Sequence, residues 1–249
     1  MHVDSTFISH LHSHIRDWKG GDTDLKGAAT LHGKAPTGLH KEYPRMARIM
    51  LPAPEELIFP LDKALRERSS YFKCTSNRSL SESELGTLLG NAVGTRGQIN
   101  RNYPSGGALF PIETYLVGDV LEGQPSGVFH YHPRVHALEF LWKTPDSFSM
   151  TDIVRAKNVP LGPMLMVFTS MWGRSAIKYG KLAYSNSLIE VGHMGQNILL
   201  TATALSIGGR PMNAVMEPAI VELLDLDERV EQFVYSILLC PSLNRAADK

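Results

Sequence analysis

The sequence of 249 residues predicts an α+β fold that combines an antiparallel sheet with helices. Two segments, GVFHYH and HALEFLW, alternate in polarity on either side of residues 133–135, a pattern typical of a β-hairpin. The apolar stretches TYLVG, MLMVFTS and FVYSILLC predict further strands, and the last two are apolar enough to lie centrally in a sheet. Helical patterns occur between these strands, and nothing marks a second folded domain.

The order of the elements begins with residues 1–51, which are rich in Gly, His, Thr and Lys and lack sustained periodicity. They are expected to form an irregular arm that packs on a domain of residues 52–249. The first helix of this domain is expected at residues 61–68. The second begins at a capping box formed by Ser81 and Glu84, ahead of apolar residues at helical spacing.

The longest helix is predicted at residues 188–207. Within it, Gly192, Gly195, Leu199 and Ala202 follow one another at steps of three and four residues. A narrow stripe with two glycines allows close approach of a second backbone, although each glycine weakens an isolated helix by about 1 kcal/mol relative to alanine. The helix is therefore expected to be buried on most sides, either within the domain or across a dimer axis.

The charges exclude several classes of partner. Lys and Arg total 25 and Asp and Glu total 25, so no basic excess indicates nucleic acid and no polybasic tract indicates an anionic membrane. The apolar runs are shorter than a membrane span, and the N-terminus lacks the pattern of a secretion signal. We expect a soluble, cytoplasmic protein without nucleic-acid or membrane partners.

Cysteines and histidines give no expected metal site. Cys74 and Cys240 are far apart in sequence and lack CxxC spacing, which argues against a disulfide scaffold and against a zinc ribbon. The segment HLHSH, residues 10–14, would place three imidazoles on one face of a strand. A polar surface arm is the preferred interpretation, because no cysteine stands nearby in sequence to complete a ligand set.

Four short motifs carry polar groups or glycines that suit a ligand site. In RNYPSGGALFPIETY, residues 101–115, a glycine turn leaves room for a flat ligand and frees backbone N–H donors. In RERSSY, an arginine and a serine can bind a phosphate. SIGGRP follows the longest helix, and KYG precedes it. Each also has an ordinary structural explanation: a β-turn, an exposed helix end, a helix C-cap and a surface helix start.

In chain order, RERSSY, then PSGGALFP leading into ETY, then KYG, then the helix sequence EVGHMGQNILLTATALSIGG and finally LLDLDERVEQFVYSILL together resemble one family. The chain resembles a SagB-type dehydrogenase, from a branch of the flavin-dependent nitroreductase superfamily that includes azoline oxidases. The resemblance spans about residues 51–241. It implies a nitroreductase-like fold with a central sheet flanked by helices, an intertwined homodimer, and FMN bound in each interface.

The resemblance also implies roles for individual residues. It places the FMN phosphate at Arg68 and Ser70, and it assigns the surroundings of the isoalloxazine ring to Ser105, Gly107, Gln196 and Gly208. The first two of these ring residues are candidates for contact with the neighbouring subunit's flavin. Phe72 departs from the family, which has a basic residue there, and Lys73 or Arg78 are the candidates to replace that charge. Ser185 departs at a position where the family often has arginine.

In azoline oxidases an adjacent Lys-Tyr pair is catalytic, and Lys178 and Tyr179 match it. Oxidising a thiazoline or oxazoline to its aromatic ring requires a base, because one carbon loses a proton while its neighbour passes a hydride to FMN. Free lysine and tyrosine titrate near pH 10, so either would need a lowered pKa. The pattern does not decide which one takes the proton. Both face one substrate only if the chain turns there, and Gly180 permits a turn.

The resemblance thus predicts an FMN-dependent dehydrogenase that acts on azoline rings in a ribosomally made peptide, beside cyclodehydratase subunits. Two alternatives remain open. One is an NAD(P)H-dependent nitroreductase-like enzyme that acts on small molecules, and the KYG pair argues against it. The other is a degenerate flavin domain that serves as a scaffold in a synthetase complex. Phe72 keeps this alternative open, because it stands where the family has a basic residue.

Overall fold

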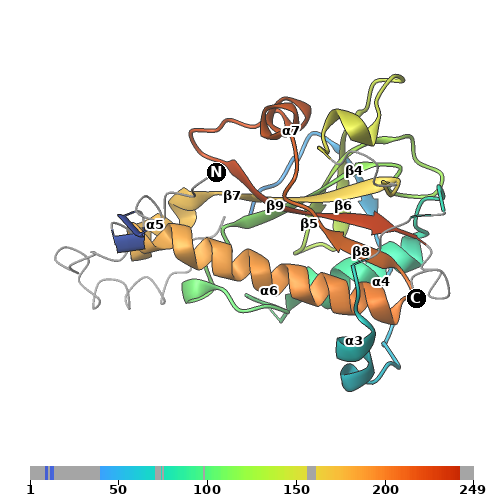
Figure 1. The fold of residues 1–249 in the computed structure, drawn as a ribbon, viewed down its shortest axis with the longest axis horizontal. Coiled ribbons are helices and arrows are strands. Elements are labelled where there is room, and N and C mark those ends of the chain that lie inside the picture. Colours follow the sequence, from blue (N-terminus) through green and yellow to red (C-terminus); the bar gives the residue numbers. More distant parts are fainter. Residues whose placement is uncertain are drawn as a thin grey trace.

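The computed structural model describes residues 9–10, 12–13, 40–70, 74, 76–97, 99–155 and 161–241. A seven-stranded sheet lies at the centre, with strand order β1-β6-β5-β4-β7-β9-β8 and antiparallel pairing between all neighbours. Helix α6 crosses one face of the sheet beside α4, and α7 covers the other face (Figure 1). The predicted α+β class with an antiparallel sheet is confirmed.

The sheet strands are β1 (Ala47–Met50), β4 (Ile112–Gly118), β5 (Gly127–His132), β6 (Ala137–Lys143), β7 (Met164–Ser170), β8 (Gly208–Pro211) and β9 (Gln232–Cys240). A two-stranded ribbon contains β2 (Thr95–Arg96) and β3 (Asn100–Arg101). The α-helices named are α3 (Leu61–Glu67), α4 (Glu82–Val93), α5 (Trp172–Tyr179), α6 (Leu182–Ala204) and α7 (Glu217–Leu224). Two 3-10 turns are η1 (Gly106–Ala108) and η2 (Met150–Asp152).

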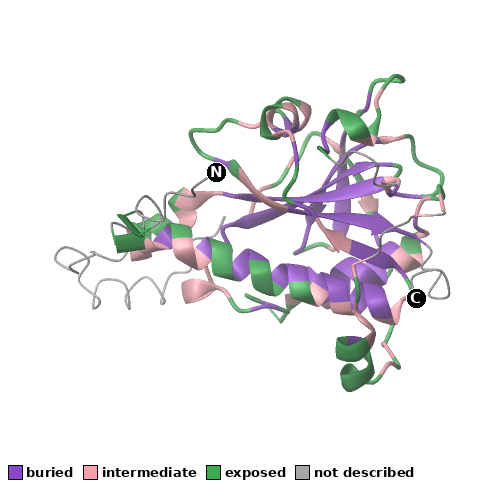
Figure 2. Cartoon of the chain, viewed as in Figure 1, coloured by how far each residue is buried: buried purple, intermediate pink, exposed green. Residues whose placement is uncertain are grey.

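The central strands are apolar throughout because both faces of the sheet are covered. Met166 and Phe168 of β7 join the core beneath α4 and α6, whereas Leu165 and Val167 of the same strand join the core beneath α7. Figure 2 shows the strands at the middle of the sheet as buried. A strand that is buried on both sides has no reason to alternate in polarity, which explains the run MLMVFTS.

Several local predictions are confirmed. GVFHYH and HALEFLW form β5 and β6, joined in an antiparallel hairpin. Helix α4 begins with the predicted capping box, in which the Ser81 Oγ accepts from the Glu84 N–H and the Glu84 carboxylate accepts from the Ser81 N–H. The end of the expected arm differs, because residues 47–50 form β1, which pairs with β6 at the edge of the sheet.

The longest helix is displaced from its prediction. Helix α6 begins at Leu182, six residues before the expected start, because Ala183 and Ser187 continue its buried face through the polar sequence YSNS. It ends at Ala204, and Ser206, with φ of 59°, takes the left-handed conformation after it. The helix C-cap expected at Gly208 and Gly209 is therefore wrong, and both glycines lie in β8.

The glycine stripe of α6 faces the chain's own sheet. A β-carbon at Gly195 would lie 2.8 Å from the Tyr235 ring of β9, so this glycine lets helix and sheet approach closely. Leu199 and Ala202 are buried beside it. A β-carbon at Gly192 would meet nothing within 4 Å, so this residue lies on the outer face. The stripe thus packs within the domain at three of its four positions.

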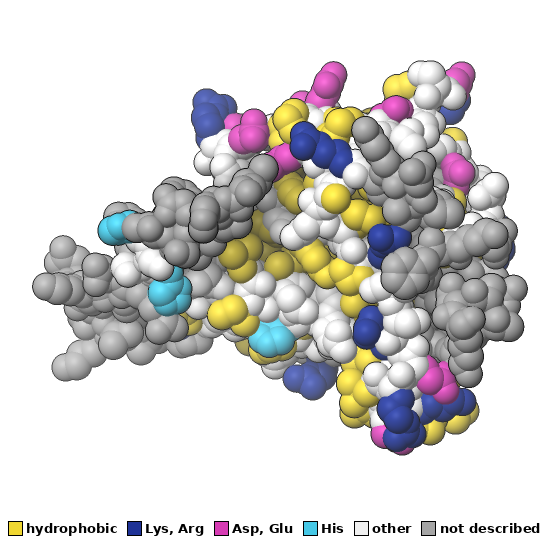
Figure 3. Space-filling view, in the orientation of Figure 1, with side chains coloured by type: hydrophobic (Ala, Val, Ile, Leu, Met, Phe, Trp, Pro, Cys, Tyr) yellow, Lys and Arg dark blue, Asp and Glu magenta, His cyan; other side chains and the backbone are white. Residues whose placement is uncertain are grey.

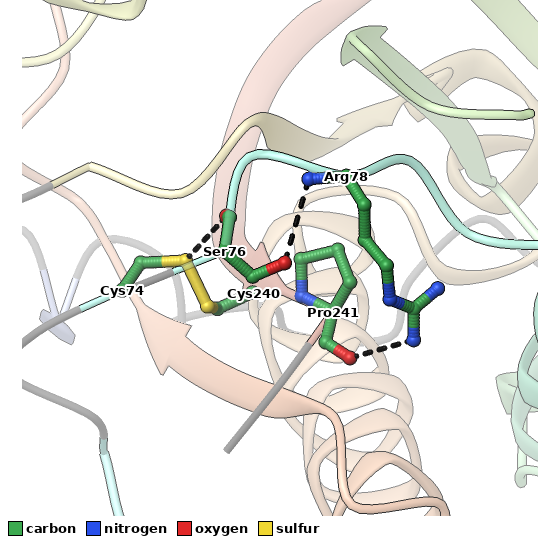
Figure 4. The surroundings of a disulfide bond; sticks show 5 residues. All are labelled: Cys74, Ser76, Arg78, Cys240 and Pro241. Carbon is green, nitrogen blue, oxygen red and sulfur yellow. Dashed lines mark hydrogen bonds between the residues drawn. A yellow bond between two sulfur atoms is a disulfide. The ribbon is translucent and has the colours of Figure 1, made fainter. Parts of the chain in front are cut away.

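The expectation that the two cysteines do not pair is wrong. Cys74 and Cys240 form a disulfide, with 5.6 Å between their α-carbons and 166 residues between them in sequence (Figure 4). The fold brings them together because Ser70 forms a parallel bridge with Gly209 of β8, and Gly208 of that strand pairs with Cys240 of β9. Distance along the chain says nothing about such a contact, since strands from distant segments pair side by side.

His10 and His12 are helical and exposed, so the strand that would align the imidazoles of HLHSH does not form at these residues, while His14 lies outside the described residues. Within the described part of the chain, no helix is long and apolar enough to cross a membrane.

Replacing both cysteines, Cys74→Ser with Cys240→Ser, is expected to lower the free energy of unfolding by about 2–4 kcal/mol, because the cross-link closes a long loop of the unfolded chain. Urea unfolding with and without a thiol reductant measures this change. The reductant should destabilise the parent protein to the level of the double variant and leave the variant unchanged. Equal sensitivity of both proteins to the reductant would contradict the bond.

Candidate active site

The last turn of α5 places Lys178 and Tyr179 against the loop that begins PSGG. A β-carbon at Gly107 would lie 3.0 Å from the Lys178 Nζ and 3.0 Å from the Tyr179 Oη. The Lys178 Nζ also lies 5.5 Å from the centre of the Tyr179 ring. The two polar ends therefore meet at Gly107, although consecutive residues point about 100° apart on a helix, because both side chains are long. Gly180, with φ of 50°, ends the helix after the pair and does not separate them.

The loop opposite the pair is held in a conformation that only glycine adopts easily. Gly107 has φ of 64°, in the left-handed region, within η1. The Ser105 Oγ accepts from the Phe110 N–H at 2.9 Å, which closes the turn. A side chain at Gly107 would both strain the backbone and displace Lys178 and Tyr179. The sequence PSGG therefore brings the loop backbone directly onto the polar pair.

Between this loop and α6 lies a cavity of about 320 Å³. Its lining comes from the loop, the end of α5 and the first half of α6: Pro104, Ser105, Gly106, Tyr179, Asn186, Ile189, Glu190 and His193. A second cavity of about 370 Å³ is lined by the β2–β3 ribbon and the same loop, and Pro104 and Ser105 line both cavities. The structure thus brings together four of the predicted site residues: Lys178 and Tyr179 meet at Gly107, and Ser105 and Tyr179 line the first cavity.

Glu190 is the carboxylic acid of the first cavity. Its residue is 3% exposed, and among the described residues its Oε1 has no hydrogen-bond partner. Burial raises the pKa of Glu190 to about 7, against the opposing effects of the Ser105 hydroxyl, which hydrogen-bonds the carboxylate, and of the Arg101 charge. A carboxyl group with this pKa exchanges its proton near neutral pH, so it can act as an acid or a base there.

Glu190 was not among the site residues predicted from the sequence, although its position on the helix carries a signal. The residue lies three positions after Ser187 and four before Met194, on the buried face of α6. A carboxylate in phase with buried positions is uncommon, because burying a charge is costly unless it is paired. Reading the helix for polar residues on its apolar face would have identified it.

A buried ion cluster fixes the start of α5. Arg174 lies 2.5 Å from the Glu113 carboxylate of β4, and it donates to the Phe110 carbonyl of the loop at 3.1 Å. His130 of β5 lies between Glu113, at 3.1 Å, and Glu139 of β6, at 2.9 Å. Burial by itself would raise the pKa of Glu113, but the His130 hydrogen bond and the Arg174 charge lower it to about 2.

The residues predicted for the FMN phosphate lie elsewhere. Arg68 is the C-cap residue that follows α3, a helix that packs against α6, and Ser70 bridges to Gly209 beside Gly208. A β-carbon at Gly209 would lie 2.6 Å from Leu199 of α6, so β8 approaches this helix closely. Because Asn186 beside Gly106 and Leu199 beside Gly209 are 13 residues apart, about 20 Å of helix separates the two groups.

The other predicted residues have the following places. Gln196 lies between the two groups, on the exposed side of α6. Phe72 and Lys73 lie outside the described residues. Arg78 hydrogen-bonds Glu84 and the Pro241 carbonyl, so its charge is engaged there (Figure 4 shows the bond to Pro241). The Ser185 hydroxyl donates to the Leu182 carbonyl of its own helix.

One group of described residues has metal-ligand chemistry. The ligand atoms of His40, Glu42 and His132 lie within 4.8 Å of one another. The Glu42 carboxylate is 3.1 Å from the Arg48 guanidinium, which already supplies a cation at this place. We assign no metal to it.

Comparison with known proteins identifies the class. Residues 65–239 match the model of the nitroreductase family, so the chain belongs to that family, and membership indicates an oxidoreductase. A Methanocaldococcus jannaschii protein with a provisional nitroreductase name, MJ1384, is 29% identical over 196 residues, which cover 78% of this chain and 94% of that protein. The microcin B17-processing protein McbC of Escherichia coli is 29% identical over 164 residues, 63% of this chain and 60% of McbC.

Two solved structures extend the comparison. A chain of the E. coli microcin synthetase McbBCD complex, which has truncated pro-MccB17 bound, superposes with a TM-score of 0.61 at 23% identity over 85% of this chain and 80% of that one. A nitroreductase-like protein of Exiguobacterium sibiricum in complex with FMN has a TM-score of 0.51 at 10% identity, over 76% of this chain and 91% of that one. At these identities the likeness shows the fold.

Replacing Arg174 by methionine is expected to lower the free energy of unfolding by about 3 kcal/mol, because Glu113 would keep a buried charge with one cationic partner removed. Chemical denaturation at pH 7 measures the loss. Arg229→Met is the matched control. Arg229 pairs with Asp227 on the surface, where solvent screens the charges and the loss of one partner has little effect on stability. Equal effects of the two substitutions would show that the buried pair has no special weight.

Proposed function

We propose that this protein is an FMN-dependent dehydrogenase that oxidises thiazoline or oxazoline rings in a ribosomally synthesised peptide. One observation carries the proposal: the Lys178 amine and the Tyr179 hydroxyl converge on Gly107 at the edge of a cavity. A proton-transferring pair at a glycine loop is what the removal of a proton from carbon requires beside a flat cofactor. The relationship to McbC, a peptide-processing protein, supports a peptide substrate.

The residues present fit FMN at two places. Arg68 and Ser70 offer a charge and a hydroxyl for the phosphate, beside Gly208. Ser105 and Gly107 offer a loop whose backbone can lie against the ring, because no side chain stands at Gly107, and Gln196 lies on α6 between the two places. When bound, FMN supplies the acceptor for the substrate's hydride.

The spacing of these two groups supports a homodimer. About 20 Å of α6 separates them within one chain. A second copy would bring the phosphate group of one chain to the Ser105–Gly107 loop of the other. The outer side of α5 and α6 suits such contact, since Ile177, Tyr184, Leu188 and Ile189 are 39–69% exposed. Figure 3 shows a band of hydrophobic side chains across the middle of the face that α6 crosses.

In the proposed reaction the chain's own groups orient the substrate and move its proton. Ile189, 59% exposed on α6, offers an apolar wall of the cavity for a ring. Lys178 and Tyr179 share the position next to the loop, where an ammonium stabilises negative charge that develops on the neighbouring tyrosine oxygen. Cyclodehydratase subunits that form azoline rings are the expected partners, and the McbBCD synthetase fold relative supports an assembly of this kind.

A second candidate function is reduction of small molecules with NAD(P)H. The relative MJ1384 favours it, because the match covers 94% of that protein and its provisional name is that of a nitroreductase. The two functions differ in the source of electrons. An azoline peptide bleaches the flavin of the first without added nicotinamide under anaerobic conditions, whereas the second requires NADH or NADPH. A colourless protein that takes up no FMN would favour a scaffold instead.

Lys178→Ala and Tyr179→Phe are each expected to slow azoline oxidation by roughly 100-fold or more, the range for removing a positioned acid or base. Anaerobic flavin bleaching by a synthetic thiazoline peptide measures the rate. The double variant should be little slower than the slower single variant if the pair acts as one unit. FMN content and reduction by dithionite are the controls and should not change. If both variants oxidise the azoline peptide at the parent rate, Lys178 and Tyr179 have no catalytic role and are simply the last residues of α5.

Gly192→Leu is expected to weaken the homodimer, because its side chain would project from the exposed side of α6 into the partner. Leucine also has the higher helix propensity, so the single chain should not lose stability. Sedimentation over a range of concentrations measures the dimer dissociation constant. Glu222→Leu is the matched control, because Glu222 is exposed on α7, on the opposite face of the sheet from α6. A dimer that tolerates Gly192→Leu would place α6 outside the interface.

A further inference from the structure

We propose that Glu190 is the terminal proton acceptor of the reaction, receiving through the Tyr179 hydroxyl the proton that leaves the ring carbon. Both residues line the same cavity of about 320 Å³, and the Glu190 Oε1 is unpaired among the described residues. This inference rests on the proposed function, and it assigns a destination to the proton that Lys178 and Tyr179 remove.

The need for such a group comes from acid–base chemistry. An ordinary tyrosine or lysine titrates near pH 10, so at neutral pH either side chain is present almost entirely in its protonated form. A protonated tyrosine can still pass a proton on, if it donates its own to a nearby base as it receives one from carbon. A carboxylate that titrates near neutral pH is an efficient base under those conditions.

Glu190 has the surroundings that such a base requires. It is 3% exposed, so its charged form is poorly hydrated and its basicity exceeds that of a surface carboxylate. Ser105 lies beside Glu190 in the lining of the cavity, and its hydroxyl favours the ionised carboxylate and so opposes the rise in the pKa of Glu190. Arg101, held by a 2.7 Å bond to the Tyr103 hydroxyl, contributes a positive charge that keeps the ionised form attainable.

The titratable and charged groups around Glu190 come from each element packed near it. The β2–β3 ribbon and the loop after it contribute Arg101, Tyr103 and Ser105. The end of α5 contributes Lys178 and Tyr179, and α6 itself contributes His193. Glu190 is the sole carboxylic acid among the residues that line this cavity. Glu190 is therefore the one residue of this lining that can accept the proton as a carboxylate.

The step balances. The ring C–H bond next to the carbonyl breaks, and its electron pair forms the new ring double bond. The neighbouring carbon loses a hydride to FMN, so the substrate is oxidised by two electrons and the flavin is reduced. The proton ends on the free oxygen of Glu190 as a new O–H bond. Glu190 then returns the proton to solvent through the open side of the cavity before the next turnover.

The test compares the parent protein, Glu190→Gln and Glu222→Gln in anaerobic stopped-flow reduction by a synthetic thiazoline peptide between pH 5.5 and 9. Only the ionised form of Glu190 accepts a proton. The parent rate should therefore rise about tenfold per pH unit up to an inflection near pH 7 and level off above it. Glu190→Gln should be roughly 100-fold slower and lack this inflection. Glu222→Gln, an exposed control, should match the parent.

A second variant and a measurement without turnover complete the test. Ser105→Ala removes a hydrogen bond to the carboxylate, so the inflection should move to higher pH. In the parent protein without peptide, a carbon-13 carboxyl resonance that is absent from Glu190→Gln should titrate near pH 7. Titration near the ordinary value of about 4.3 would overturn the inference.

The outcomes separate the inference from the proposed function. If the peptide reduces the flavin of the parent and of Glu190→Gln with the same rate and pH profile, the role of Glu190 is overturned and azoline oxidation stands. If the peptide reduces neither protein at any pH while dithionite reduces both, azoline oxidation is overturned, and this role with it. The inference is supported if Glu190→Gln loses the inflection while the parent and Glu222→Gln keep it.

Discussion

The ion pair between Glu113 and Arg174 joins the sheet to the candidate active site. Glu113 lies in β4, where His130 and the Lys41 N–H also contact its carboxylate, so its position is fixed from three directions. Arg174 carries this constraint to α5 and, through its bond to the Phe110 carbonyl, to the loop beyond Gly107. The positions of Lys178, Tyr179 and the loop that they contact therefore depend on the buried carboxylate of Glu113.

This arrangement explains why a charge is retained within an otherwise apolar sheet. A buried ion pair is weak evidence for stability, because desolvation opposes the attraction between the two charges. It does define direction, since a guanidinium donates along fixed lines. An apolar contact at the start of α5 would leave the helix free to rotate by a fraction of a turn. Such a rotation would separate Lys178 and Tyr179 from Gly107, because the two side chains approach it from consecutive positions.

How much could be predicted from the sequence depended on how local the determining interaction is. The β5–β6 hairpin and the capping box at Ser81 are set by neighbouring residues, and both were predicted correctly. The Cys74–Cys240 bond and the strand position of Gly208 depend on pairing between distant segments, and both were missed. The start of α6 was missed because its first turns contain the polar sequence YSNS, in which Ser187 lies on the buried face although it is not apolar.

The same distinction applies to the site. The PSGG and KYG motifs were selected because they occur together and in an order that resembles a known family, and their contact with each other emerged only from the fold. Glu190 looks ordinary in sequence, since glutamate is common in helices. Its chemistry comes from burial beside Ser105 and Arg101, which lie 85 or more positions earlier in the chain. A property that arises from an environment assembled in three dimensions has no short sequence motif.

The two halves of the proposed FMN site are each fixed, and by different means. Ser70 is held by its bridge to Gly209, and the segment that follows it is cross-linked at Cys74 to Cys240, whose strand pairs with Gly208. The other half is held by the Glu113 cluster. Because α6 is a single helix between them, their separation within one chain is fixed. A ligand that contacts both halves across two chains would find its groups positioned in advance, which reduces the free energy lost on ordering them when it binds.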